Sequence, residues 1–380
     1  SIAIKIPFVL FLIYIEKKVL LRIILSALIF LSTLGLSMIQ SRAAFVAIGF
    51  ILIAYLALQL FLYFNNNRKF SQVLNFGYLL IPLLMAIFVN QFYFSQKGAD
   101  ALSRAATISV NTSDGSINQR LRYYEDVLTH MSSNPIFGVG LGNWKLKSID
   151  YDSKDITGYV VSYHAHSDFI QLGAELGILG FLLYLGIFLW AIYYVYILIR
   201  YSDLDVDEKV FLFLLLTALG VYSVDANLNF PIARPQVLVV WAFIMGAITV
   251  YYQKYRNLSI KIKPNKIINT SFLIVVILLV IPSIYVSNKV YESLKGQMFL
   301  LQDFNSNQYN IPLNRIDNLV PNIPNITVTT IPINSVKARY YLNANKYDKA
   351  LALAEKGTNA NPYLFYSELL KSQIYKAQGK

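Results

Sequence analysis

The chain contains no cysteine and few charged side chains. Without cysteine, neither a disulfide framework nor a thiolate metal site can form. Only 14% of the 380 residues are charged and 56% are hydrophobic, whereas a soluble domain usually carries about 25% charged residues. This scarcity of charge excludes an ordinary soluble fold and points to a membrane protein.

Long apolar stretches recur along the chain. A helix needs about 20 apolar residues to cross a hydrocarbon core of about 30 Å, and it satisfies its own backbone hydrogen bonds there. The expected spans are residues 2–15 (partial), 19–39, 43–63, 71–93, 169–199, 210–224, 236–252 and 268–287. The sequence thus predicts an all-α, polytopic transmembrane protein with about eight visible spans. The first stretch has no initiator Met and no signal-peptide layout, which suggests an N-terminal truncation.

The remaining segments are arranged around these spans. We expect transmembrane helices in residues 1–94, a large loop in 95–165, transmembrane helices again in 166–287, an Asn- and Pro-rich linker in 288–334, and helices in 335–380. In the last segment, Ala338, Tyr341, Ala350, Ala354 and Pro362 follow the tetratricopeptide frame, although Ala354 stands where Phe is usual and Trp is absent. A generic helical hairpin is the alternative.

The net charge of +12 has a distribution that favours membrane topology over nucleic-acid binding. The 95–165 loop is balanced, and the surplus lies in short inter-span loops and in the tail. Cytoplasmic loops are enriched in Lys and Arg. By this rule the cytoplasmic set contains Lys17, Lys18, Arg22, Arg68, Lys69, Arg200, Lys209, Lys254, Arg256, Lys261, Lys263 and Lys266. The large loop and the chain after Ser287 then face outside, which is periplasmic in a cell with two membranes.

Two of the three histidines lie at the outer mouth of a predicted span, in the run His164-Ala-His166-Ser-Asp168. Histidine titrates near neutral pH and can take or give a proton. A lone interfacial histidine is more often merely solvated. Here Asp168, Gln171 and Glu175 gather at the same membrane face, which favours a chemical role.

A zinc site is a weaker alternative for this run. The string His-x-His-x-Asp resembles the ligands of metallo-β-lactamase-type hydrolases, in which another His follows, but here Phe169 follows. His130 is the one histidine left to serve as a distant ligand. We therefore expect neither a metal nor another cofactor.

Three arginines are expected on the same side. Arg42 stands at the outer end of a span, and Arg120 and Arg122 precede a helical stretch in the large loop. Guanidinium groups bind phosphate oxygens bidentately. Each arginine alone is more often a surface charge, but together, near His166, they would suit a pyrophosphate.

Residues 135–144 read Pro-Ile-Phe-Gly-Val-Gly-Leu-Gly-Asn-Trp. This is neither a Rossmann nor a P-loop pattern, because no strand precedes it and no Lys-Ser/Thr pair closes it. We predict a tight loop whose glycines let backbone approach a ligand or the membrane surface. Phe137 and Trp144 would suit a membrane interface.

Four elements in this order together resemble the O-antigen ligase/polymerase family of bacterial envelope glycosyltransferases. They are Ser41-Arg42 opening a span, Arg120 followed by the 135–144 loop, His166-Ser167 with nine residues before Gly177-x-x-Gly180, and the turn Phe230-Pro231…Arg234-Pro235. The resemblance covers about residues 20–250, and the histidine–glycine element is its specific part. The tail resembles a branch of the family that has a tetratricopeptide-like tail and includes protein O-oligosaccharyltransferases.

The resemblance implies a multi-pass protein of the bacterial inner membrane and a polyprenyl (undecaprenyl) diphosphate-linked glycan as donor. It implies that Arg42 and Arg120 bind the diphosphate and that His166 activates the acceptor hydroxyl, without a metal. Candidate supporting residues are Arg122, His164, Asp168, Glu175 and Arg234. His164 is an additional histidine to which the resemblance assigns no role.

The predicted function is therefore transfer of the glycan to an acceptor hydroxyl at the periplasmic face, as in lipopolysaccharide biosynthesis. The acceptor would be lipid A core, another glycan or a protein, so a polysaccharide polymerase and a protein O-oligosaccharyltransferase are alternatives with the same chemistry. A non-enzymatic transporter is less favoured. Transporters usually place ionisable residues near the midplane, whereas these spans are nearly free of charge.

Overall fold

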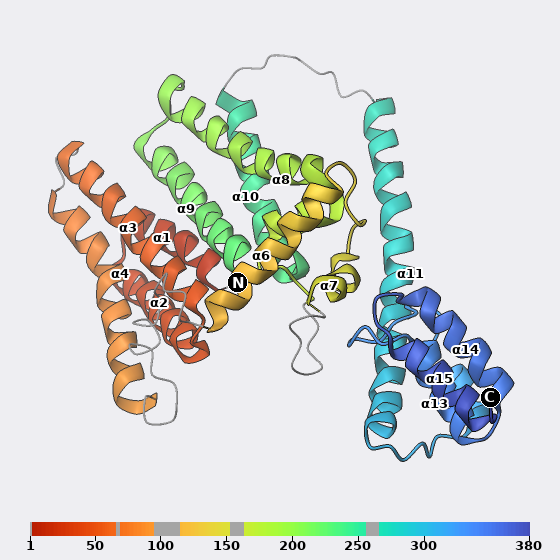
Figure 1. The fold of residues 1–380 in the computed structure, drawn as a ribbon. Helices are drawn as coiled ribbons and strands as arrows, with labels where there is room; N and C mark the ends of the chain where they lie inside the picture. The colour runs from red at the N-terminus through yellow and green to blue at the C-terminus, as the bar shows by residue number, and fades with distance from the viewer. Residues whose placement is uncertain (1, 66–68, 95–114, 153–162, 256–265) are drawn as a thin grey trace. The chain divides into compact units, whose positions relative to one another are not determined.

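The computed structural model describes residues 2–65, 69–94, 115–152, 163–255 and 266–380. These residues form helices and no strand (Figure 1). Among them, 7 helices are long and apolar enough to cross a membrane, which confirms an all-α polytopic membrane protein. The first expected span forms η1 (Ala3–Lys5) and α1 (Ile6–Ile15), which together are too short to count among the seven.

The chain divides into two compact units. The first comprises Ser1–Leu141 and His164–Ile260, and the second comprises Gly142–Tyr163 and Lys261–Lys380. The predicted orientation rests in part on Arg68, Arg256, Lys261 and Lys263, which lie outside the described residues, as does much of the 95–165 loop. The assignment of the large loop to the periplasm therefore stays a prediction.

The first unit is a bundle of apolar helices. After α1 come α2 (Val19–Ile39), α3 (Arg42–Asn65), α4 (Lys69–Val89), η2 (Asn90–Phe94), α6 (Gly115–Ser133), α8 (Asp168–Tyr201), α9 (Val206–Leu228), η4 (Pro231–Ala233) and α10 (Pro235–Tyr255). α2 packs on α4, α3 packs on both α4 and α9, and α8 packs on α6, α9 and α10. Apart from α6 and the short η helices, these helices coincide closely with the predicted spans, because length and hydropathy determine them.

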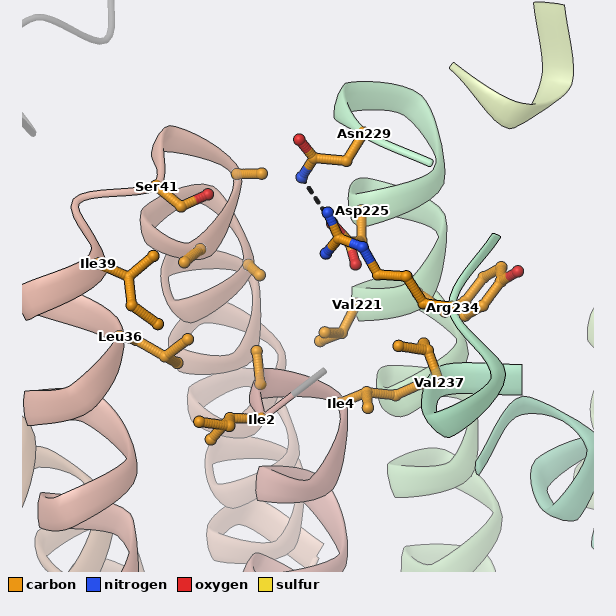
Figure 2. A pocket seen from close by; sticks show the side chains of 15 residues that line it. Ile2, Ile4, Leu36, Ile39, Ser41, Val221, Asp225, Asn229, Arg234 and Val237 are labelled. Atoms are coloured by element: carbon orange, nitrogen blue, oxygen red, sulfur yellow. Dashed lines mark hydrogen bonds between the residues drawn. The ribbon is translucent and has the colours of Figure 1, made fainter. Parts of the chain in front are cut away.

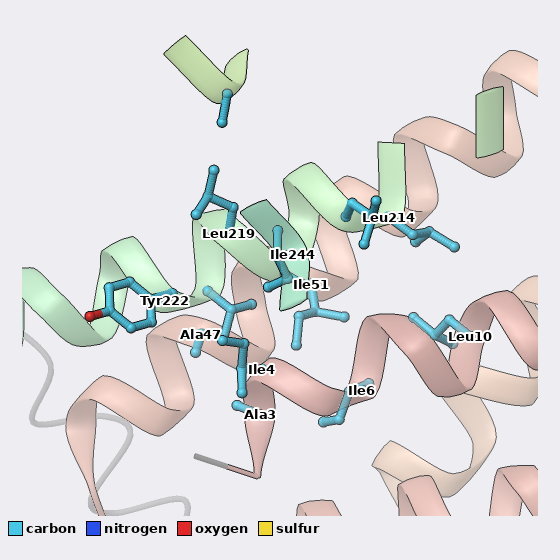
Figure 3. Close-up of a cluster of buried hydrophobic side chains, with 14 of the residues drawn as sticks. Ala3, Ile4, Ile6, Leu10, Ala47, Ile51, Leu214, Leu219, Tyr222 and Ile244 are labelled. Atoms are coloured by element: carbon cyan, nitrogen blue, oxygen red, sulfur yellow. The ribbon is translucent and has the colours of Figure 1, made fainter. Parts of the chain in front are cut away.

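The core of this unit lies where η1, α1, α3, α9 and α10 meet (Figure 3). Ile4, Leu10, Ile51, Leu214 and Ile244 are fully buried there. Lipid tails are as apolar as leucine, so such helices associate through close packing rather than through exclusion from water. Gly220 is one such close approach, since a Cβ on it would lie 2.5 Å from the Phe50 ring. This packing brings the ends of distant helices together.

Two connections determine where the polar residues stand. Gln40, with φ 55°, ends α2 in the left-handed conformation. The carbonyl of Ser41 then accepts hydrogen bonds from the N–H groups of Ala44 and Phe45, which opens α3 with Arg42 in its first turn. At α8, the side chain of Ser167 accepts from the Ile170 N–H at 3.5 Å. His166 therefore stands directly before a capped helix start.

The second unit contains α7 (Trp144–Asp152), α11 (Lys266–Asn305), α12 (Leu313–Leu319), α13 (Ile333–Asn343), α14 (Tyr347–Ala360) and α15 (Tyr366–Ala377). α11 continues far beyond residue 287, where we expected its span to end. Its last turns carry Leu300, which is buried with Ile316 and Val336 in a small separate core. The helix continues because this core packs against it, which the Asn- and Pro-rich composition of residues 288–334 did not indicate.

The tail helices α13, α14 and α15 pack against one another (Figure 1). Ala338, Ala350 and Ala354 are fully buried between them. A Cβ on Gly357 would lie 1.8 Å from Ser335 Oγ, so a larger residue there would have to displace the Ser335 side chain. Tetratricopeptide repeats and generic helical hairpins both bury such positions, and the tetratricopeptide assignment stays a prediction.

Candidate functional site

Gly177 interrupts α8 with φ 70° and ψ −170°. A break of this kind leaves backbone groups without their helical partners, and a low-dielectric setting requires that other groups pair with them. The 135–144 loop supplies those partners. The N–H groups of Val139 and Gly140 donate to the carbonyls of Ala174 and Glu175 at 3.0 and 2.8 Å, and the carbonyl of Pro135 accepts from the Ile178 N–H at 2.8 Å.

Two glycines make this contact possible. Gly138 and Gly177 both have positive φ, and added Cβ atoms would lie 2.4 Å from the Ala174 carbonyl oxygen and 2.1 Å from the Ile136 carbonyl oxygen. The predicted tight loop is therefore present, and its backbone pairs with the broken helix. The glycines of the histidine–glycine element thus shape the helix that follows His166.

The aromatic ends of this loop differ from expectation in one respect. Trp144 is only 1% exposed, so it does not face a membrane interface as we predicted. Its ring packs beside that of Tyr151, with centroids 5.9 Å apart. Phe137 remains 84% exposed, which fits an interfacial position.

His166 is held by α6 and by the turn after α9. Its backbone has φ 56°, and the Tyr124 hydroxyl lies 3.2 Å from its carbonyl oxygen and 3.0 Å from that of Asn227. The Tyr123 ring is parallel to the imidazole with centroids 6.1 Å apart, and the Phe230 ring stands edge-on at 5.6 Å. Burial also raises the pKa of the Tyr124 phenol, which keeps it a hydrogen-bond donor.

The imidazole of His166 is half-buried, and its Nδ1 has no hydrogen-bond partner within the described part of the chain. Burial, and then the positive charge of Arg120 and the proximity of His164, lower the pKa of His166 from its ordinary 6.5. Each of these effects disfavours the charged imidazolium. His166 is therefore neutral at neutral pH and able to accept a proton.

Arg120 and Arg122 are placed differently on α6. Arg120 is half-buried and lies on the helix face that carries Tyr123 and Tyr124, three and four residues further on. Arg122 is exposed, and two residues rotate a helix by about 200°. The structure brings Arg120, and not Arg122, into the electrostatic environment of His166.

His164 joins a chain of polar contacts along the first turns of α8. Its Nδ1 lies 3.3 Å from Gln171 Oε1, which also accepts the Ala165 N–H at 3.2 Å. The amide nitrogen of Gln171 donates to Glu175 Oε1 at 3.2 Å. Because the Ala165 N–H requires an acceptor, the amide oxygen of Gln171 faces His164, and His164 Nδ1 carries the proton in this contact.

Asp168 connects the start of α8 to η4. It is fully buried, and its Oδ2 accepts the Ile232 N–H at 2.9 Å. Its other oxygen, Oδ1, has no hydrogen-bond partner among the described residues. The contact holds the turn after α9 against the segment that carries His166.

A cavity of about 230 Å³ lies between the α2–α3 connection and the ends of α9 and α10 (Figure 2). Its polar lining comes from Ser41, Asp225, Asn229 and Arg234, and Asn229 donates to Asp225 Oδ1 at 2.7 Å. Ser41 faces Asn229 and Arg234 across the space. Arg42 is half-buried and follows Ser41 directly in the chain, while Arg234 lines the cavity itself.

Most of the candidate residues are thus at one end of the first unit. Tyr124, Asp225 and Asn229 were missed from the sequence, although Tyr124 follows Arg120 by one helical turn and Asp225 and Asn229 stand one turn apart at the end of a span. Within the described residues, no group of three or more His, Asp and Glu side chains is arranged to hold a metal ion.

A bundle of membrane-spanning helices with a neutral histidine and arginines at one end defines a polytopic membrane protein with a polar site at the end of its spans. Residues 8–185 match the family model described as O-antigen ligase. This part of the chain, which includes Arg42, Arg120, His166 and Gly177, is similar to that family, and the match supports the resemblance seen in the motifs. Comparison with curated proteins and with solved structures gave no match. The match supports a glycosyltransferase-type enzyme acting in lipopolysaccharide biosynthesis.

Proposed function

We propose that the protein transfers a glycan from a polyprenyl-diphosphate carrier to an acceptor hydroxyl at the periplasmic face of the bacterial inner membrane. The observation that carries the proposal is the state of His166, whose Nδ1 is unpaired within the described residues and whose pKa is held below 6.5 by burial and by Arg120. A neutral imidazole beside a guanidinium suits a general base that acts next to an anionic leaving group.

In the proposed reaction, the acceptor oxygen attacks the anomeric carbon of the donor sugar while its proton passes to His166. The bond between that carbon and the diphosphate oxygen breaks, and the lipid diphosphate leaves with the electron pair. A positioned base typically contributes about 10²–10⁴-fold. Attack opposite the leaving group inverts the anomeric centre.

Arg42 and Arg120 stabilise the charge that develops on the leaving diphosphate, because guanidinium groups bind phosphate oxygens in bidentate fashion. The diphosphate is already a good leaving group, so this scheme requires no metal and no nucleotide. Arg42 lies in the first turn of α3, next in sequence to the cavity residue Ser41. Arg120 lies on α6, where its charge affects His166.

The family match favours lipid A core as the acceptor. A growing glycan or a protein hydroxyl would use the same residues, which makes a polymerase and a protein O-oligosaccharyltransferase the alternatives. A transporter is less favoured, since the described polar groups gather at the end of the spans rather than at mid-membrane.

The test uses membranes that contain the protein and a labelled lipid-linked donor, with lipid A core, repeat units or an acceptor protein added separately. We expect one acceptor to become labelled, and His166→Ala to lower that transfer by about 100-fold or more. Arg122→Ala serves as the control, because Arg122 is exposed on another face of α6. Full transfer by His166→Ala would refute the assignment of His166 as the base.

A further inference from the structure

The Phe230 ring contacts two side chains, the imidazole of His164 and the guanidinium of Arg234. On one side the His164 ring stacks on it, with centroids 4.0 Å apart and planes 13° from parallel. The Arg234 guanidinium carbon lies 4.9 Å from the Phe230 centroid. A stacked ring fills one face of Phe230, so the guanidinium occupies the other. The result is a layered arrangement of His164, Phe230 and Arg234.

Arg234 has an unused binding capacity. Its guanidinium lines the cavity and makes no hydrogen bond or ion pair to any described residue, so its contact with Phe230 is a cation–π contact alone. Five N–H donors thus remain for a ligand in the cavity. An arginine held over an aromatic ring keeps its donors directed sideways, where a planar or bidentate acceptor can bind them.

The backbone of the turn is held independently of this stack. Pro231 and Pro235 restrict the residues that precede them, and Arg234 is accordingly extended, with φ −118° and ψ 96°. Asp168 accepts the Ile232 N–H at 2.9 Å. The backbone at Arg234 is therefore held in place, and only the side-chain torsions of Arg234 can vary. The contact with the Phe230 ring restrains these torsions.

His164 and Asp168 are the residues two before and two after His166, and both contact this turn. His164 does so through the Phe230 ring, and Asp168 through the Ile232 N–H. His164 is itself fixed by Gln171 at 3.3 Å. The short segment that presents His166 thus also fixes the turn that presents Arg234, which couples the positions of the two functional groups.

We propose that Arg234 binds the diphosphate of the lipid-linked donor from the α10 side of the cavity, and that His164 and Phe230 are positioning residues that hold its guanidinium there by stacking. This inference rests on the proposed function for the identity of the ligand. In this inference, His164 acts by stacking its planar ring on Phe230 and takes no part in proton transfer.

The test measures binding of undecaprenyl diphosphate to the purified full chain in lipid nanodiscs. We expect Arg234→Gln to weaken binding by about tenfold or more, the scale of one charge-assisted hydrogen bond. His164→Ala and Phe230→Leu should weaken it by about threefold, the scale of one aromatic or cation–π contact. Arg200→Gln, which removes an exposed arginine from the last turn of α8, is the matched control and should bind as the unmodified protein does.

Conservative variants separate positioning from chemistry. His164→Phe and Phe230→Tyr preserve the stack and should restore binding to within about twofold. In the transfer assay, His164→Ala should raise the donor KM with little change in kcat, whereas His166→Ala should lower kcat. If His164 acts through Arg234, His164→Ala should have almost no further effect in the Arg234→Gln background.

Two results would overturn the inference. Unchanged probe binding by Arg234→Gln would remove Arg234 from the site, and equal loss in His164→Phe and His164→Ala would show that the ring nitrogens, not stacking, matter. These results are distinguishable from failure of the proposed function. If the proposed function fails but this inference holds, His166→Ala would retain transfer while Arg234→Gln would still weaken binding of the diphosphate probe.

Discussion

The Glu208 cluster and the segment around His166, at opposite ends of the first unit, differ in how their polar groups are paired. At the end where α9 begins, Glu208 accepts hydrogen bonds from the Lys254 ammonium at 3.3 Å and from the Tyr255 hydroxyl. Asp205 and Glu208 also complete a reciprocal capping box. At the other end, His166 Nδ1 and Asp168 Oδ1 are buried and have no hydrogen-bond partner in the described part of the chain.

This difference fits a structural role for the Glu208 cluster and the functional role proposed for His166. Buried polar groups are nearly always hydrogen-bonded, because an unpaired one costs stability. The Glu208 cluster follows that rule and needs no ligand to explain it. His166 Nδ1 and Asp168 Oδ1 depart from it within three residues of sequence, which fits the proposed binding of a ligand near His166.

The largest expected effect comes from the glycine that shapes the functional end. Gly177→Ala would force a side chain into positive φ and place its Cβ 2.1 Å from the Ile136 carbonyl oxygen. We expect a loss of about 2–4 kcal/mol in stability, and loss of transfer with it. Thermal unfolding of the purified protein and the transfer assay would measure both.

Gly186→Ala is the matched control, since it lies in the same helix and an added Cβ there meets nothing within 4 Å. It should be neutral or slightly stabilising. Equal stability of the two variants would show that the kink is not required.

The next effect concerns the electrostatic link between Arg120 and His166. His166 must be neutral to accept a proton, so transfer should fall as the pH drops through its pKa. That acid limb should lie below pH 6.5, because burial and Arg120 lower the pKa. In Arg120→Gln the limb should move to higher pH, and the rate at pH 7 should fall by about 10- to 100-fold through the lost diphosphate contact.

The pH–rate profile of Arg122→Gln provides the comparison. Arg122 is exposed and on another face of α6, so its profile should keep the position of the acid limb. A limb that stays in place in Arg120→Gln would contradict the proposed link.

The smallest effect is expected at the opposite end. Asp205→Ala removes the acceptor for the Glu208 N–H, now 2.7 Å away, and should lower stability by about 1 kcal/mol. Transfer per folded molecule should not change. Asp203→Ala removes an exposed carboxylate two residues earlier and should leave stability unaltered. A loss of transfer in Asp205→Ala would break the distinction between the two ends.

Much of the fold could be predicted because hydropathy acts locally. The expected span at residues 19–39 is α2 (Val19–Ile39) to the residue, since a bilayer leaves an apolar stretch no alternative to a helix. The end of α11 could not be predicted in this way. Its polar last turns are helical because Leu300 is buried in the small core of the second unit, a contact with residues far along the chain.

The candidate site shows the same division. Sequence alone placed His166, Arg42 and Arg120 in one family pattern, and these residue types suit the proposed chemistry because guanidinium groups bind phosphate and imidazole accepts protons. Tertiary structure decided that the half-buried Arg120, and not the exposed Arg122, shares a helix face with Tyr123 and Tyr124 beside His166, and that the glycine loop pairs with a broken helix. It also brought Ile232 to Asp168 across 64 positions of sequence. Helix spans follow from local hydropathy, whereas these contacts depend on how the helices pack, which no single segment encodes.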